Sequence, residues 1–201
     1  MANAIHKLTY GLFILTAKDG NKDNGCIINT VTQVTSEPNR ISIAVNKSNY
    51  THDIIAKTGE FNVSILTENS KFETYKHWGF QSGKDVDKLE AISFKRAENG
   101  ITYITNETNA YISAKVISSI DLGTHTLFIA DVTASEVLSD DQSVTYDYYH
   151  KNIKSKPEKS DDIKKGFICT ICGYIYEGDT LPDDFVCPLC KHPASDFEPI
   201  K

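Results

Sequence analysis

Two pairs of closely spaced cysteines near the end of the chain constrain its fold more than any other feature. The pairs are Cys169-Thr-Ile-Cys172 and Cys187-Pro-Leu-Cys190, and they hold four of the five cysteines. Two Cys-x-x-Cys hooks joined by a loop can place four thiolates at the corners of a tetrahedron, which suits a zinc or a single iron ion. So short a segment lacks a core of its own, and the bound ion has to stabilise it.

The residues around the hooks bear on the choice of metal. Gly173 lets the backbone curl around a sulfur so that main-chain N–H groups point at it, and such hydrogen bonds tune the potential of an iron–sulfur centre. Pro188 stiffens the second hook. An aromatic cap over the site is predicted from Tyr174, Tyr176, Phe185 and Phe197. The spacing alone also fits a zinc ribbon, so a structural zinc site is the alternative.

The stretches from Ile168 to Asp179 and from Leu181 to Cys190 resemble a rubredoxin. The resemblance covers residues 166–201, and it departs from the pattern twice. The loop between the hooks is shorter than in free-standing rubredoxins, as in rubredoxin modules fused to larger proteins, and Phe185 stands where tryptophan is usual. Neither departure touches a ligand. The resemblance implies one iron ion per chain, held by Cys169, Cys172, Cys187 and Cys190.

Composition and charge exclude several classes of protein. The chain has 201 residues, is 40% hydrophobic and 24% charged, and has a mean hydropathy of -0.33, as a soluble globular protein does. No apolar run approaches the roughly 18 residues of a membrane span, and no secretory signal is recognisable. Four thiolates kept for a metal favour a reducing compartment, so we expect a cytoplasmic protein. The net charge of -6 argues against nucleic acid as a partner.

Residues 151–165 predict a linker. They are rich in lysine and include Pro157, a composition typical of a flexible tether. The predicted organisation is therefore a domain over residues 1–150, the linker, and a small metal-binding domain over residues 166–201.

The first 150 residues predict a mainly β domain. Hydrophobic residues alternate with polar ones in three stretches, the period of a half-buried strand, and these are residues 41–45, 61–65 and 112–116. Longer β-rich runs cover residues 8–17, 26–36 and 125–138. Asn24-Gly25 and Asn99-Gly100 predict hairpin turns. Short helices are expected at residues 49–58, stopped by Gly59, and at about 70–78. Many short strands with few helices suggest a closed barrel.

The segment Asn46–Asp53 is suited to a phosphate group. It joins a predicted strand to a predicted helix, and Ser48 or Asn49 can cap that helix. The free N–H groups at the helix start, with Lys47 and the hydroxyls of Ser48 and Thr51, would hold a dianionic phosphate. A capping residue beside a surface lysine needs no ligand, so this segment alone does not establish a site.

Five segments in order resemble the flavin reductase-like, FMN-binding split-barrel family, over about residues 5–150. They are residues 24–38, 41–55, 59–66, 82–88 and 123–132. The resemblance implies a split β-barrel with short helices and a homodimer with FMN near its interface. It implies that the flavin ring faces Asn29, Thr30, Val31 and Thr32. It also implies that the phosphate is held by Lys47, Ser48, Asn49 and Thr51, with Ser82 and Lys84 as further candidates for the same cofactor.

Three other features are open to more than one interpretation. His125 is a candidate for contact with a nicotinamide, although an ordinary hydrogen-bonded histidine fits as well. Cys26 is expected to be a small buried hydrophobe rather than a redox thiol. The aromatic residues of Tyr146–His150 are expected to pack first and to neighbour a flavin second. The absence of a Gly-rich dinucleotide fingerprint means that NAD(P)H would bind only transiently, over the flavin.

The two predicted domains together form an electron relay. A nicotinamide gives up two electrons as a hydride and a single iron accepts one, whereas a flavin can take a hydride and release electrons singly. The pairing resembles the high-molecular-weight rubredoxins of anaerobes, whose usual partners are flavodiiron proteins that reduce nitric oxide or dioxygen. We therefore predict an oxidoreductase that passes electrons from NAD(P)H, preferably NADH, through FMN and iron to such an acceptor. The alternatives are a free-flavin reductase with an incidental metal module, and a non-enzymatic zinc-ribbon binding module.

Overall fold

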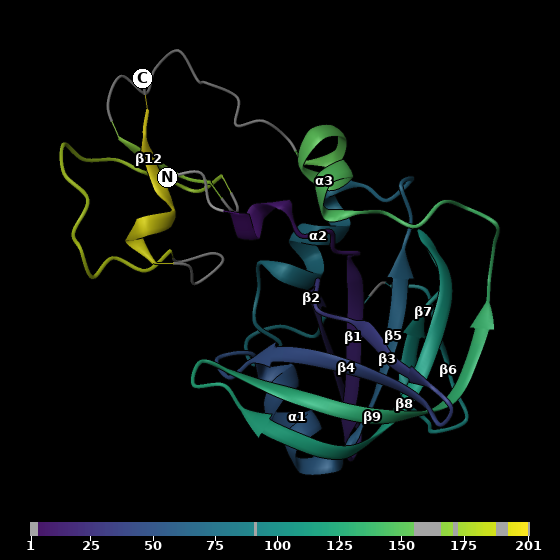
Figure 1. Ribbon diagram of the computed structural model, residues 1–201. Coiled ribbons are helices and arrows are strands. Elements are labelled where there is room, and N and C mark those ends of the chain that lie inside the picture. The colour runs from purple at the N-terminus through teal and green to yellow at the C-terminus, as the bar shows by residue number, and fades with distance from the viewer. Residues whose placement is uncertain (1–3, 91, 155–165, 171–172, 188–192, 201) are drawn as a thin grey trace.

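The chain forms a larger β domain and a smaller three-stranded domain, which lies beside the end of the larger one that carries α2 and α3 (Figure 1). The computed structural model describes residues 4–90, 92–154, 166–170, 173–187 and 193–200. No helix in this described part is long and apolar enough to cross a membrane.

Seven antiparallel strands of the larger domain form one curved sheet in the order β2-β1-β5-β8-β9-β4-β3. These strands are β1 (Phe13–Asp19), β2 (Lys22–Ile28), β3 (Thr32–Ser36), β4 (Asn39–Asn46), β5 (Glu60–Leu66), β8 (Thr108–Asp121) and β9 (His125–Val137). Across the ranges that the structure describes, the edge strands β2 and β3 do not pair with each other. The barrel is therefore split, and the expected mainly β split barrel with short helices is observed.

Short elements complete the chain. In the larger domain these are a first 3-10 turn (Ala4–Lys7), α1 (Tyr50–Thr58), α2 (Phe72–Gly79), the hairpin β6 (Phe94–Arg96) and β7 (Thr102–Ile104), α3 (Tyr146–Tyr148) and a π-helical turn (Tyr149–Ile153). The smaller domain contains β10 (Phe167–Cys169), β11 (Ile175–Tyr176), a 3-10 turn (Ala194–Asp196) and β12 (Phe197–Pro199). Its sheet order is β11-β10-β12.

Helix α1 begins and ends where local signals place it. The side chain of Asn49 accepts a hydrogen bond from the N–H of Thr51 at 3.0 Å, which caps the first turn. Gly59 follows the last turn at φ 72, a left-handed conformation that glycine adopts without strain. Ile54 and Ile55 are buried against the barrel. The predicted helix over residues 49–58 is confirmed, and α2 confirms the one at about 70–78.

One predicted turn is wrong. Asn24 and Gly25 lie inside β2, and the chain reverses at Gly20 and Asn21 instead. Gly25 serves close packing, because a Cβ at this position would approach the ring of Trp78 to 2.7 Å. The run over residues 26–36 is likewise two strands, since β2 ends at Ile28 before β3 begins. By contrast, Asn99-Gly100 does form the turn between β6 and β7.

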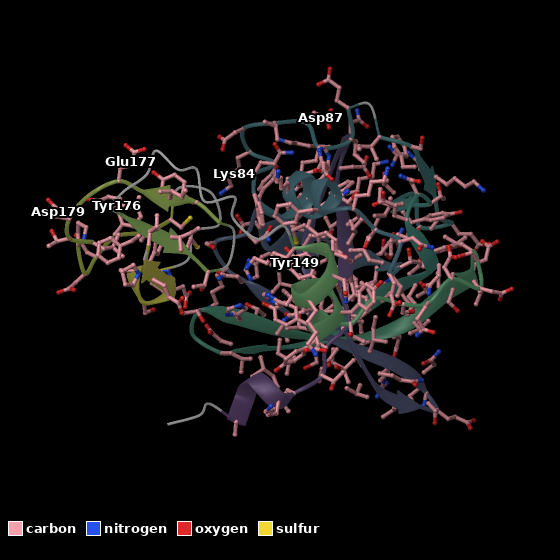
Figure 2. The ribbon with its side chains drawn as sticks, turned by 90° about the horizontal axis from the view of Figure 1, so that it is seen from above. Lys84, Asp87, Tyr149, Tyr176, Glu177 and Asp179 are labelled. Atoms are coloured by element: carbon pink, nitrogen blue, oxygen red, sulfur yellow. The ribbon has the colours of Figure 1, made fainter. Side chains whose placement is uncertain are left out.

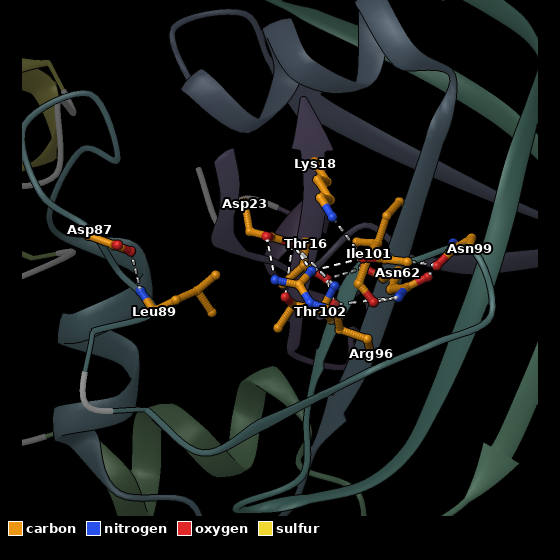
Figure 3. A network of polar contacts seen from close by, with 11 residues as sticks. Thr16, Lys18, Asp23, Asn62, Asp87, Leu89, Arg96, Asn99, Ile101 and Thr102 are labelled. Carbon is orange, nitrogen blue, oxygen red and sulfur yellow. Dashed lines mark hydrogen bonds and ion pairs between the residues drawn. The ribbon is translucent and has the colours of Figure 1, made fainter. Parts of the chain in front are cut away.

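A polar network fixes the β6–β7 hairpin to the barrel (Figure 3). The guanidinium of Arg96 donates two hydrogen bonds to the carboxylate of Asp23, at 3.0 and 2.9 Å, and Thr102 donates to the same carboxylate at 2.9 Å. The amide of Asn62 donates to the carbonyl of Ile101 at 2.9 Å. The Asp23 side chain is only 4% exposed and the Arg96 side chain is 42% exposed, so the pair is shielded from water on the carboxylate side.

Candidate functional site

A cavity of about 470 Å³ opens at the end of the barrel near α2 and the C-terminal turns. Its volume falls in the range of about 300–1,000 Å³ found for small-molecule sites. Its walls come from six segments far apart in the sequence, around residues 12, 26–30, 44–50, 75–88, 125 and 146–150. Its lining includes Cys26, Ile28, Asn29, Thr30, Asn46, Ser48, Asn49, Tyr50, Trp78, Phe80, Ser82, Lys88, His125, Tyr146, Tyr149 and His150.

The start of α1 forms the polar wall of the cavity. Asn46 accepts hydrogen bonds from the N–H and the hydroxyl of Ser48, both at 2.9 Å, which orders the turn into the helix. Ser48, Asn49 and Tyr50 all line the cavity. The N–H groups of a helix start and the positive end of its dipole favour an anionic group such as a phosphate.

The predicted lysines lie outside the cavity lining. Lys47 Nζ lies 2.6 Å from a carboxylate oxygen of Asp121. Lys84 Nζ lies 3.6 Å from Asp53 and 5.5 Å from the centre of the Tyr50 ring, on the side of the barrel toward the small domain (Figure 2). Both lysines therefore have partners at the surface near the start of α1.

The remaining predicted residues divide between the cavity and its surroundings. Asn29, Thr30, Ser82 and His125 line the cavity. Thr51 is fully buried beneath it, where its hydroxyl accepts a hydrogen bond from Asn24 at 2.9 Å. Val31 and Thr32 are outside the lining; Val31 is half-buried against the barrel core, and Thr32 is exposed.

Tyr75, Trp78 and Lys88, which the sequence did not single out, complete the cavity together with Tyr149 from the predicted aromatic segment. Trp78 from α2 is 1% exposed, and Tyr149 from the π-helical turn packs on Tyr75 with ring centres 4.4 Å apart. Lys88, in the loop after α2, is only 3% exposed. Nothing local marks Lys88 as buried, because Asp85 and Asp87 beside it give the loop the composition of an exposed segment.

Burial shifts the pKa values of several groups on the cavity wall, among them Lys88, Cys26 and His150. Burial lowers the pKa of Lys88 to about 8, which leaves the amine protonated at neutral pH. Burial raises the pKa of the Cys26 thiol, against the opposing effect of a hydrogen bond with Thr51, so the thiol is neutral. Burial also lowers the pKa of His150, and the imidazole is therefore neutral at pH 7. The 3% exposure of Cys26 agrees with its expected role as a small buried side chain.

The small domain supplies the candidate metal centre. Cys169 ends β10 and is 1% exposed, and Cys187 is fully buried. The other two predicted ligands, Cys172 and Cys190, lie outside the described residues, and among those described no three potential ligands form a metal-binding group. Two buried sulfur donors in an apolar cluster fit a soft-ligand metal such as iron or zinc.

The backbone turns at Gly173, directly after the first cysteine hook. Gly173 adopts φ 80, and its N–H donates to the carbonyl of Cys169 at 2.9 Å. The N–H of Cys169 donates in turn to the carbonyl of Tyr174 at 2.8 Å. Glycine adopts this left-handed conformation without strain. The sequence prediction that main-chain N–H groups here point at a sulfur stays a prediction.

The predicted aromatic cap surrounds Phe185. Its ring lies edge-on to Tyr176 and Phe197, at centre distances of 4.7 and 5.4 Å, and 6.5 Å from the ring of Tyr174. These rings pack against Cys169 and Cys187. Phenylalanine at this position therefore fills the place of an aromatic cap without a polar handle.

Phe80 connects the two parts of the molecule. Its side chain lines the cavity, stacks edge-on to Phe72 at 6.0 Å between ring centres, and packs against the cluster of Cys169 and Cys187. Lys154 donates a hydrogen bond to the carbonyl of Thr170, which adds a polar contact between the domains. One side chain thus touches both the cavity and the apolar surroundings of the metal centre.

Comparison with known proteins assigns both domains. The flavin reductase like domain family matches residues 5–156, and the rubrerythrin, rubredoxin-like domain family matches residues 167–198. The high molecular weight rubredoxin of Moorella thermoacetica is 35% identical over a 225-residue alignment that covers 98% of each protein. The ferric-chelate reductase (NAD(P)H) of Archaeoglobus fulgidus is 36% identical over 157 residues, which is 78% of this chain and 93% of that protein.

Solved structures show the same barrel. An NADH:FAD oxidoreductase from Streptomyces globisporus matches with a TM-score of 0.63 at 20% identity, over 69% of this chain and 81% of that one. An FMN-binding protein from Thermus thermophilus matches with a TM-score of 0.62 at 19% identity, over 69% and 76%. The chain belongs to the flavin reductase-like family, and it is an electron-transfer oxidoreductase in which the flavin reductase-like domain is followed by a rubredoxin-like domain.

Proposed function

We propose that this oxidoreductase passes electrons from NAD(P)H, preferably NADH, through FMN in the cavity to one iron ion held by the four cysteines of the small domain. A flavodiiron-type protein is the proposed acceptor. The observation that carries the proposal is the position of Phe80, which lines the cavity and packs against the cysteine cluster of the same chain. An electron relay needs a short distance between its two redox sites, and Phe80 lies between them.

Different residues of the cavity would contact different parts of FMN. The start of α1, with Ser48 and Asn49, is suited to the phosphate, and Asn29 and Thr30 offer polar contacts to the ring. Tyr146, Tyr149 and His150 line the cavity on the side of the C-terminal turns. Val31, Thr32, Lys47, Thr51, Ser82 and Lys84 remain proposed cofactor contacts.

The chemistry of the relay belongs to the groups that the chain would bind. FMN accepts a hydride and gives up single electrons, and iron takes one electron at a time. His125 lines the cavity with its Nδ1 2.9 Å from the hydroxyl of Thr124, and it is the proposed contact for the nicotinamide. The protein supplies binding and orientation and needs no general base of its own.

A homodimer and an acidic docking face are parts of the same proposal. Ile117, Ile120 and Leu122, toward the C-terminal end of β8 and just after it, are about half exposed, and a second copy of the chain would cover them. Glu177 and Asp179 lie on the side of the small domain that faces away from the barrel (Figure 2). An acidic outer face of this kind suits an acceptor with a basic docking surface.

An anaerobic titration of the full chain with NADH tests the relay. Flavin and ferric-thiolate absorbance are followed in the same visible spectrum, and we expect both to bleach, the flavin before the iron. Flavin bleaching without an iron response would favour a free-flavin reductase. A colourless protein with one zinc per chain would overturn the proposal in favour of a zinc-ribbon binding module.

A further inference from the structure

Lys88 is a buried cation on the wall of the cavity. Its side chain is 3% exposed, and its Nζ donates hydrogen bonds to the carbonyl of Gly25 at 2.9 Å and to that of Trp78 at 2.8 Å. An ammonium group carries three hydrogens, so one remains beyond these two bonds. Lys88 lines the cavity, so this third hydrogen is available to a ligand bound there.

The positive charge of Lys88 has no acidic partner in the part of the chain that the structure describes. The cavity lining contains no aspartate or glutamate and no second lysine or arginine. The ionisable neighbours on the wall are Cys26, whose burial keeps the thiol neutral, the tyrosines Tyr50, Tyr75, Tyr146 and Tyr149, and His125 and His150. A buried charge without a counter-charge is costly, and folded proteins retain such charges where a ligand or a reaction uses them.

A purely structural role is the competing explanation. The two hydrogen bonds that Lys88 donates connect β2 to the end of α2. A lysine at this position could serve only to hold these two elements together. That role needs two donors, but it needs neither a net charge nor a position on the cavity wall. The two explanations therefore differ in what happens when the charge alone is removed.

We propose that Lys88 is the electrostatic partner of the flavin ring, holding the negative charge that the ring acquires on reduction. This inference rests on the proposed function. Hydride transfer from NAD(P)H adds two electrons and one proton to the ring, releases NAD(P)+, and leaves one negative charge on the reduced ring. A fixed positive charge beside the ring stabilises that product more than the neutral oxidised form. Lys88 thereby raises the reduction potential of the bound flavin.

The test compares full-length variants loaded with FMN. Lys88→Met removes the charge and Lys88→Arg keeps it, while Lys57→Met removes an exposed charge that is paired with Asp19 at 2.6 Å. The midpoint potential is measured by equilibration with a reference dye, and the affinity for oxidised FMN by equilibrium dialysis. We expect Lys88→Met to lower the affinity for reduced relative to oxidised FMN about tenfold, which is about 30 mV for a two-electron couple. Lys57→Met should leave the midpoint potential unchanged. Lys88→Arg, which keeps the charge, should have a midpoint potential close to that of the unaltered chain.

An unchanged potential in flavin-loaded Lys88→Met would overturn the proposal and leave Lys88 as a structural link. If that variant does not fold, Lys88→Gln, which keeps hydrogen-bond donors without the charge, is measured in its place with the same two outcomes. Failure of the unaltered chain to bind FMN would instead refute the proposed function, and this inference with it. The two failures are distinguished by the flavin spectrum of the unaltered protein.

Discussion

The barrel and the small domain are stabilised in different ways. The barrel buries two large apolar clusters, one around Leu15, Ile43 and Phe61 and one around Trp78 and its neighbours. Among the described residues of the small domain, the buried cluster comprises Cys169, Cys187 and Phe197, and two of these are predicted metal ligands. The barrel therefore has a core that can hold it without a cofactor, whereas the fold of the small domain depends on its ion.

Removal of one metal ligand should have the largest effect, confined to the small domain. We expect Cys187→Ser to lose the metal and unfold residues 166–200, because a structural metal contributes on the order of 10 kcal/mol to so small a domain. The ferric-thiolate absorbance should vanish while the melting temperature of the barrel stays the same. Cys26→Ser, which lies in the barrel, should retain the absorbance. Full metal content in Cys187→Ser would contradict this division.

A cavity in the barrel core should have the reverse effect. Phe61 is fully buried, and Phe61→Ala should lower the free energy of barrel unfolding by about 3–5 kcal/mol through lost packing. The ferric-thiolate absorbance at room temperature should not change. Urea unfolding followed by tryptophan fluorescence measures the barrel through its one tryptophan, Trp78. Val137→Ala, at a side chain that is 74% exposed, should shift the same curve by less than about 0.5 kcal/mol. Loss of both signals together would mean that the domains unfold as one unit.

The size of the barrel core also lets it tolerate an unpaired charge. Burial lowers the pKa of Lys88 from the usual 10.5 to about 8, so between these pH values the unfolded chain binds more protons than the folded one. The stability of the flavin-free protein should therefore rise across this window, by about 3 kcal/mol in all, and this group should give no slope below pH 8. Urea unfolding from pH 7 to 10.5 measures the rise. It should be absent in Lys88→Met and present in Lys57→Met, and an equal rise in both would refute the assignment.

The contact between the two domains should give the smallest effect. Phe80 is half-buried and touches both the cavity and the cysteine cluster, so Phe80→Ala should weaken their association by about 1 kcal/mol. Stopped-flow absorbance should show iron reduction slowed severalfold after flavin reduction, while Phe80→Leu, which keeps apolar bulk, stays closer to the parent. An unchanged rate of iron reduction in Phe80→Ala would mean that electrons do not cross at this contact.

Local signals made much of the fold predictable. The cap at Asn49, one of the two candidates, and the stop at Gly59 depend on hydrogen bonds between residues a few positions apart, and both lie where the sequence predicted them. The strand alternation in β4 is equally local, because successive side chains point to opposite faces. The Asn24-Gly25 pair failed as a turn signal because packing against Trp78, distant in sequence, decided the role of that glycine.

By itself, the sequence determined the two domains, the cysteine hooks and the polar start of α1, since each is encoded by spacing within a short segment. Only the tertiary structure decided which side chains share the cavity, because its walls come from segments as far apart as β2, α1, α2 with the loop after it, and the C-terminal turns. It also decided that Lys88 is buried and that Phe80 touches both domains. Burial of a charge and contact between distant segments depend on long-range packing, which residue spacing does not encode.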